Sequence, residues 1–132
     1  MLDQVEIFHG LSSDELAALE HSSTSETYSK NTVVIQENEP ADALYVIESG
    51  RVKVYCSDKN GKEFIMNSLG VGDYFGELAL LDDSARSASV RTVEPCQFRI
   101  VKKEDFSKVL SDNPGITQQL LGNLAARVRK LT

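Results

Sequence analysis

The sequence predicts a mainly β fold, a small antiparallel barrel or jelly roll with helices at both ends of the chain. Six segments rich in Val, Ile, Tyr and Phe follow one another at short intervals, each with a two-residue period. Turn-forming residues separate them, and so long a series of short strands is typical of a closed or two-sheet architecture. The helical period returns near the end of the chain.

The chain has 132 residues, 41% of them hydrophobic and 26% charged, which suits one domain with its own core. We expect a single domain over residues 1–132, with an N-terminal helical segment at about 1–25, the barrel at 26–101 and C-terminal helices at 102–132. The longest apolar run, Ala43–Ile47, is too short to span a bilayer, and no secretory signal pattern precedes it. We therefore expect a cytoplasmic protein.

The first helix is marked by its N-terminal signal. Ser12 is a candidate N-cap and Glu15 follows three residues later, so the two form a capping box. The pattern predicts a helix from this point to about His21, with Leu16 and Leu19 facing inward.

The predicted strands follow this helix, and turn-forming residues separate them. The predicted strands are Thr32–Ile35, Leu44–Glu48, Val52–Cys56, Glu63–Leu69, Ser87–Thr92 and Cys96–Val101. Between the third and fourth, Asn60-Gly61 is the strongest hairpin signal in the chain.

Two helices are predicted at the C-terminal end. The residues Asp105, Phe106, Val109 and Leu110 suit a short helix. After it, Asn113 and Pro114 have the residue types of an N-cap and a first helical position.

The last helix carries one apolar stripe, formed by Ile116, Leu120, Leu124, Val128 and Leu131 and widened by Leu121 and Ala125. Two interpretations are open. The stripe packs on the barrel, or part of it pairs with a second subunit as the seam of a homodimer. Arg127 would interrupt a purely apolar seam.

The charge is unevenly distributed. The formal net charge is −6, but residues 1–98 hold seven basic and seventeen acidic side chains, whereas residues 99–132 hold seven and three. Most of this surface would repel nucleic acid. The basic C-terminal helix either has a solvated face or contacts an acidic partner.

The two cysteines, Cys56 and Cys96, lie in predicted strands with no Cys-x-x-Cys spacing. We expect two buried thiols rather than a disulfide or metal ligands.

A candidate anion site begins at Gly76, where an extended segment leads into Leu78–Leu81, which is long enough for a helical turn. A glycine before a helix start lets a ligand approach the backbone closely, and the first amides then face it. We expect the amides of Leu78 and Ala79 to donate to phosphate oxygens.

The neighbouring polar residues limit the class of ligand that fits the site. Glu77 cannot lie against an anion, so its carboxylate should accept from sugar hydroxyls. Arg86 offers a planar fork for two phosphate oxygens, and Ser87 adds a hydroxyl and an N–H group. Because there is one arginine and no Gly-x-x-x-x-Gly-Lys-[Ser/Thr] motif, a ligand of low charge such as a cyclic nucleotide fits best.

Phe75–Leu81 followed by Arg86–Val90 closely resembles the phosphate-binding cassette of the cyclic nucleotide-binding domain family, and the likeness extends to Leu44–Val54 and to Gly72-Asp73. The resemblance implies an eight-stranded antiparallel jelly roll flanked by helices, and a sensor of cAMP or cGMP rather than an enzyme. The resemblance implies that Glu77 binds the ribose. Gly76, Leu78 and Ala79 match the other positions at the start of the cassette, and Arg86 and Ser87 match the pair that binds the phosphate.

The branch that the chain resembles most is the bacterial cyclic AMP receptor and oxygen-regulator (Crp-Fnr) superfamily. This likeness implies that the purine packs on Val54, Met66 and Leu69, which we also expect in the core, and that Arg127 contacts the ligand. At the position where the branch has a helix hydroxyl, this chain has Leu131, next to Thr132.

The identity of the ligand and the output of the protein follow from the same likeness. Ser87 resembles the bacterial cAMP pattern rather than the threonine that goes with cGMP in eukaryotic members. The superfamily's helix-turn-helix is not in the sequence, so we expect the sensor part of a longer transcription regulator, with DNA contacted through a segment absent from this chain. A stand-alone module is the alternative.

Rival functions lack the residues that they need. A metal-binding cupin requires a histidine cluster in the barrel, but His9 and His21 lie outside the strands, and no histidine lies near a nucleophile for a hydrolase. An iron–sulfur sensor usually requires four thiolates, and haem on His21 would leave the cassette unexplained. A nucleotide-free dimerisation scaffold would not explain Glu77 and Arg86. We therefore expect no metal and no cofactor.

Overall fold

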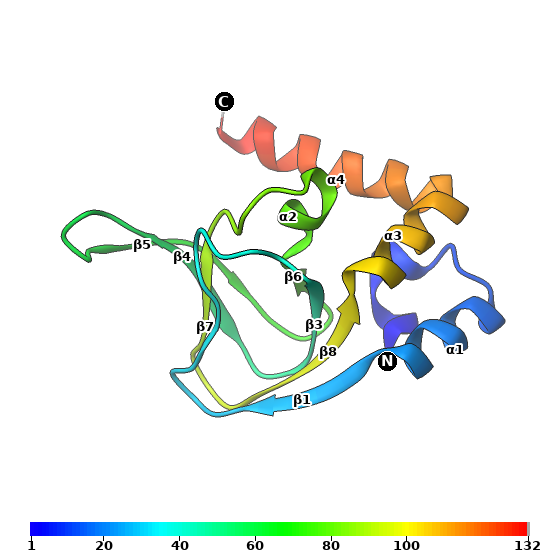
Figure 1. Ribbon diagram of the computed structural model, residues 1–132, viewed down its shortest axis with the longest axis horizontal. Helices are drawn as coiled ribbons and strands as arrows, with labels where there is room; N and C mark the ends of the chain where they lie inside the picture. Colours follow the sequence, from blue (N-terminus) through cyan, green and yellow to red (C-terminus); the bar gives the residue numbers. More distant parts are fainter. Residues whose placement is uncertain (132) are drawn as a thin grey trace.

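The computed structural model describes residues 1–131, and within them eight strands form two four-stranded antiparallel sheets (Figure 1). One sheet has the order β1 (Thr24–Tyr28), β8 (Cys96–Lys102), β3 (Ala43–Ser49), β6 (Tyr74–Phe75). The other has the order β2 (Val33–Ile35), β7 (Ser89–Thr92), β4 (Val52–Ser57), β5 (Glu63–Leu69). The jelly roll flanked by helices is confirmed.

All six strands expected from the residue pattern are present, with one correction. The strand expected at Ser87–Thr92 begins two residues later, at Ser89, because Ser87 still belongs to the connection that follows the preceding helix. The residue pattern missed β1 and β6. β1 is polar and largely exposed at a sheet edge, and β6 is two residues long.

The space between the sheets is filled around Phe98, which is fully buried. Three aromatic rings surround it, with centroid separations of 5.2 Å to Tyr28, 5.5 Å to Phe75 and 6.1 Å to Tyr45. All three meet Phe98 edge to face, the geometry that the ring quadrupoles favour. Phe98 is therefore the centre of the barrel core.

A second core lies between the barrel and the helices. It buries Leu44 and Val46 of β3 together with Phe8, Phe106 and Ile116 from the helical segments. In contrast, the alternate residues Tyr45 and Ile47 pack in the barrel core. Both faces of β3 are therefore covered by a core, which explains why the sequence of this strand is a continuous apolar run.

The helical segments are two short 3-10 turns, η1 (Leu2–Gln4) and η2 (Glu6–Phe8), and the helices α1 (Ser13–Ser22), α2 (Glu77–Asp82), α3 (Lys103–Asp112) and α4 (Pro114–Leu131). The capping box of α1 is confirmed. Glu15 N donates to Ser12 Oγ at 3.2 Å, and Ser12 N donates to Glu15 Oε1 at 3.1 Å. Pro114 is the first residue of α4, as expected.

The apolar stripe of α4 divides into two halves. Ile116 and Leu120 are buried in the second core, so the first half packs on the body of the protein. Leu121, Val128 and Leu131 are exposed. The packing interpretation therefore holds for the first half of the helix, and pairing of the second half with another subunit stays a prediction.

Both cysteines are free thiols. Cys96 is buried as expected, whereas Cys56 is half-buried, because it lies on β4 close to the turn of the projecting β4–β5 hairpin. No helix within residues 1–131 is long and apolar enough to cross a membrane.

Candidate functional site

The candidate site is built around α2, which lies between the barrel and α4 (Figure 1). Gly76 is the N-cap of α2 and has φ 90°, a left-handed conformation that favours glycine. A Cβ atom at this position would lie 2.6 Å from Arg86 Nη1 and 3.3 Å from the carbonyl oxygen of Ala43. Gly76 is therefore required both for the turn and for the close approach of Arg86.

The first amides of α2 point out of its N-terminus. Within the described part of the chain, no side chain caps this end of the helix. The N–H groups of Glu77, Leu78 and Ala79 belong to the first turn, which has no intrahelical acceptors. The Leu78 side chain is partly exposed and that of Ala79 is buried. This is the arrangement expected of an anion-binding turn.

Arg86 lies against the same turn. Its side chain is 4% exposed, Nη1 donates to the carbonyl of Gly76 at 2.7 Å, and Nη2 donates to the carbonyl of Ala43 at 2.9 Å. The guanidinium also lies 5.9 Å from the centroid of the Tyr45 ring. Burial lowers the pKa of Arg86 below its usual value, but an arginine remains charged in a protein. The two bonds use two of its five N–H donors, which leaves donors for a ligand.

Glu77 is also buried, at 4% exposure, although carboxylates are rarely buried without a partner. Its Oε1 accepts from Arg127 Nη1 on α4 at 3.1 Å, and the Arg127 side chain is half exposed. The structure thus brings Arg127 to the cassette through Glu77. The two residues are 50 positions apart in the sequence.

Ser87 follows Arg86 on the connection between α2 and β7 and is exposed. Its carbonyl oxygen lies 3.6 Å from Cys56 Sγ of β4, whose thiol donates to it. Burial raises the pKa of the Cys56 thiol, which keeps it protonated at neutral pH. Ser87 therefore lies at the surface, directly after Arg86 in the chain.

The three predicted purine contacts differ in burial. Val54 and Leu69 are half-buried against the barrel core, as expected. Met66 is 66% exposed, so its assignment to the core was wrong. It lies on β5, an edge strand of a hairpin that projects from the body of the protein and is covered by no other described strand on its outer side (Figure 1).

The end of α4 gives no hydroxyl in the described residues. Leu131 is 87% exposed, and Thr132, the alternative hydroxyl, lies outside residues 1–131.

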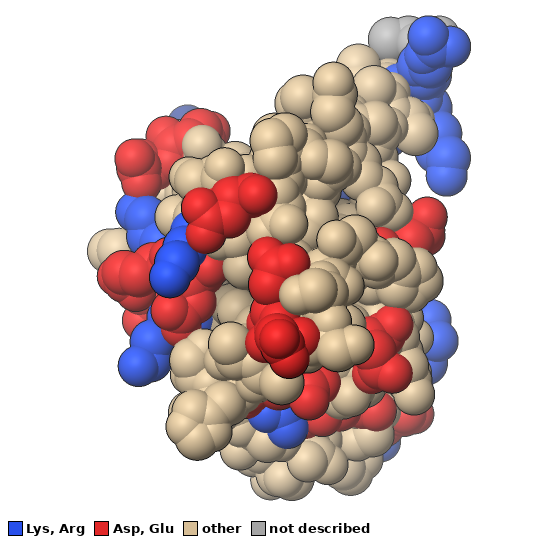
Figure 2. Space-filling model, turned by 90° about the vertical axis from the view of Figure 1, so that its right-hand side faces the viewer, with Lys and Arg blue, Asp and Glu red and all other residues tan. Residues whose placement is uncertain are grey.

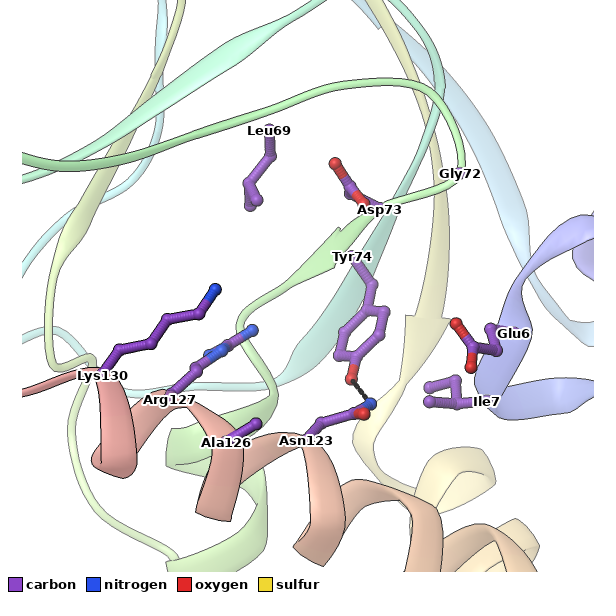
Figure 3. Close-up of a pocket in the computed structure, with 10 residues that line it drawn as sticks. All are labelled: Glu6, Ile7, Leu69, Gly72, Asp73, Tyr74, Asn123, Ala126, Arg127 and Lys130. Carbon is purple, nitrogen blue, oxygen red and sulfur yellow. Dashed lines mark hydrogen bonds between the residues drawn. The ribbon is translucent and has the colours of Figure 1, made fainter.

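A cavity of about 280 Å³ adjoins Arg127 (Figure 3). It is lined by Glu6, Ile7, Leu69, Gly72, Asp73, Tyr74, Asn123, Ala126, Arg127 and Lys130. Arg127 and Lys130 point into it from α4, and Tyr74 reaches across to α4, where its hydroxyl accepts from Asn123 Nδ2 at 3.3 Å. Burial raises the pKa of Tyr74.

The sequence interpretation did not assign Tyr74 or Asn123 to the site. A signal was present in the spacing, because Asn123 lies four residues before Arg127 and so on the same side of α4. Tyr45, which faces Arg86, was also missed, although it alternates with the apolar residues of β3.

Comparison with known families gives one match over most of the chain. The family model described as "Cyclic nucleotide-binding domain" matches residues 25–113. This range contains Gly76, Glu77, Arg86 and Ser87, whereas Arg127 lies beyond it on α4.

Curated proteins give similar results over more of the chain. A CRP-like cAMP-activated global transcriptional regulator of Mycobacterium tuberculosis is 32% identical over 130 residues, which are 98% of this chain and 58% of that protein. The cyclic AMP receptor protein of Thermus thermophilus is 30% identical over 94% of this chain and 57% of its own length. The chain thus spans a little over half the length of these relatives.

Solved structures share the fold. The sensor domain of the transcriptional regulator DNR from Pseudomonas aeruginosa aligns with a TM-score of 0.87 at 28% identity, covering 98% of this chain and 87% of that one. The catabolite activator protein of Thermus thermophilus aligns with a TM-score of 0.83 at 30% identity, covering 95% and 59%.

Proposed function

The chain belongs to the cyclic nucleotide-binding domain family, in its Crp-Fnr type, and from this premise we propose that it is a sensor domain that binds a cyclic mononucleotide, cAMP in preference to cGMP. One observation carries the proposal. The guanidinium of Arg86 lies 2.7 Å from the carbonyl of Gly76, so the buried cation adjoins the turn whose amides are uncapped. A singly charged cyclic phosphate fits between a fixed cation and such a turn.

Glu77 gives this site its sugar contact and its link to α4. A ribose hydroxyl that donates to Glu77 competes with Arg127 for the same carboxylate, which accepts from Arg127 at 3.1 Å. Ligand binding then changes the contacts of α4 with α2, and the difference in binding free energy between the two positions of α4 is the signal.

The direct test is calorimetric titration of the protein with cAMP, cGMP and the 2′-deoxy analogue of cAMP. We expect cAMP to bind more tightly than cGMP, and the deoxy analogue to bind more weakly than cAMP because it lacks the hydroxyl for Glu77. If neither cAMP nor cGMP binds, the assignment of the site is wrong.

Glu77→Gln should weaken cAMP binding by about 1 kcal/mol, because a neutral amide oxygen still accepts one hydroxyl hydrogen bond, though a weaker one than a carboxylate does. The same substitution should remove most of the difference between cAMP and its deoxy analogue. Titration of both ligands against both proteins measures this. A loss larger than that of an Arg86 truncation would contradict the ribose role.

We also propose a homodimer formed through the second half of α4, where Leu121, Val128 and Leu131 are exposed. Val128→Glu should shift the protein from dimer to monomer in sedimentation-velocity measurements, because it places a charge in the apolar seam. Gln118→Glu, which adds the same acid at an exposed position nearer the start of α4, should leave the dimer intact. A monomeric wild-type protein would remove this part of the proposal.

The output that we propose is transcription regulation. The relative from Mycobacterium tuberculosis, at 32% identity, is named as a transcriptional regulator, and the chain spans a little over half of its length. In such a regulator, a segment outside residues 1–132 contacts DNA, since this chain is acidic overall and would itself repel it.

A further inference from the structure

We propose that the groove between α1 and α3 binds an amphipathic helix of a partner protein, with basic side chains on either side of its apolar face. This surface is separate from the nucleotide site and does not depend on it. Four properties of the groove support this assignment: its shape, its apolar floor, its unpaired carboxylates and their spacing.

The groove has a volume of about 370 Å³ and is lined by residues of both helices. Leu11 and Leu19 are buried and form part of its floor, and Val109 of α3 is half-buried at its side. At one end, Asn113 Nδ2 donates to Glu15 Oε2 at 3.2 Å, which links the end of α3 to the start of α1. The two helices that form the groove are therefore held together at this end by a side-chain hydrogen bond.

The walls of the groove are acidic. Glu15 lies on the α1 side, and Asp105 and Asp112 lie on the α3 side. Lys108 of α3 is the basic residue that lines it, so carboxylates outnumber ammonium groups by three to one. Figure 2 shows the face that carries α1 and α3, where acidic side chains lie across the centre. Such a surface favours a basic partner and disfavours nucleic acid or an anionic membrane.

Asp105 and Asp112 are the carboxylates that a partner would contact most directly. Among residues 1–131 neither carboxylate accepts a hydrogen bond or forms an ion pair. In contrast, the Glu15 carboxylate accepts hydrogen bonds from Ser12 N and Asn113 Nδ2. Hydrogen bonds from Ser12 and Asn113 hold the pKa of Glu15 below its usual value, so it stays ionised as a fixed negative charge.

The spacing of these groups matches a helix. Asp105 and Asp112 are seven residues apart, about two turns or roughly 10 Å along α3, and Val109 lies between them on the same side. A partner helix with basic residues seven positions apart and apolar residues between them would meet this pattern. A groove between two helices is also the usual receptor for the apolar face of a third.

The test uses two synthetic amphipathic peptides and fluorescence anisotropy with the full chain. One peptide has two lysines seven positions apart with leucines between them, and the other has glutamates in place of the lysines. We expect the lysine peptide to bind at least about tenfold more tightly than the glutamate peptide. Chemical shifts on binding should change in α1 and α3 rather than in α2.

The variant Asp105→Asn with Asp112→Asn should weaken binding of the lysine peptide about tenfold, since it removes both unpaired charges without changing side-chain size. The control variant Glu39→Gln with Glu94→Gln removes the same charge from exposed positions outside the groove and should change binding less than about twofold.

The proposal would be overturned if the lysine peptide failed to bind, if the groove variant and the control variant weakened its binding equally, or if the glutamate peptide bound as tightly as the lysine peptide. If the groove variant instead changes self-association in sedimentation, a second copy of the chain is the occupant and the partner helix is wrong. Titration of the groove variant with cAMP separates this outcome from a failure of the nucleotide site, because the variant should bind cAMP as the wild type does.

Discussion

Arg86→Ala is expected to lower the affinity for a cyclic nucleotide by about 2–5 kcal/mol, the usual range when one member of a buried charge pair is removed. The side chain is 4% exposed and held in place by two carbonyls, so the cation is presented to the phosphate with little loss of side-chain entropy. Arg127 also reaches this turn, but it is bonded to the Glu77 carboxylate and not to the Gly76 carbonyl, so it should not replace Arg86.

Three controls accompany this prediction. Arg86→Ala also leaves the carbonyls of Ala43 and Gly76 without these donors, so its thermal unfolding should be measured beside its titration. Arg86→Lys keeps the charge but loses the planar fork, and should recover part of the affinity. Arg51→Ala, at the exposed turn between β3 and β4, should bind as the wild type does. A folded Arg86→Ala protein with unchanged affinity would contradict the site.

Phe98→Ala is expected to reduce the free energy of unfolding by about 3–5 kcal/mol. The ring is fully buried and touches Tyr28, Tyr45 and Phe75, so its removal leaves a cavity bounded by large rings that cannot collapse into it. Equilibrium denaturation in urea measures the change, and the m-value shows whether the transition remains two-state.

Phe64→Ala is the matched control, because Phe64 is 50% exposed on β5. It should change the free energy of unfolding by about 0.5 kcal/mol or less, apart from its contact with Lys62. Equal effects of the two substitutions would mean that Phe98 is not the centre of the barrel core.

Much of the fold could be predicted because local signals and packing agree. The capping box at Ser12 and the proline at residue 114 mark helix starts by chemistry that acts within a few residues. β1 could not be predicted from its pattern, since most of its side chains are exposed and its pairing with β8 depends on residues about 70 positions away. Likewise, β6 is too short to show a period.

The candidate site was predicted in part for the same reason. Gly76 could be identified because its backbone conformation requires glycine, and Arg86 lies beside it in the structure, whereas its role on the phosphate stays a prediction. The pairing of Glu77 with Arg127 depends on how α4 crosses α2, which no local pattern contains. Met66 was misplaced because an apolar residue in a strand looks the same in sequence whether or not a neighbouring layer covers it.

The first half of α4 is buried, whereas its second half is an arm that contacts the body of the protein through Asn123 and Arg127, so this arm would tilt if Glu77 moved. The last buried residue of the helix is Leu120, and Leu131 is eleven residues further on, about 16 Å at the helical rise. A tilt of about 10° around Leu120 would move the far end by roughly 3 Å, which is enough to change which side chains meet there. Because Arg127 lies along this arm, a movement of a fraction of an ångström at Glu77 would be magnified before it reaches the tip.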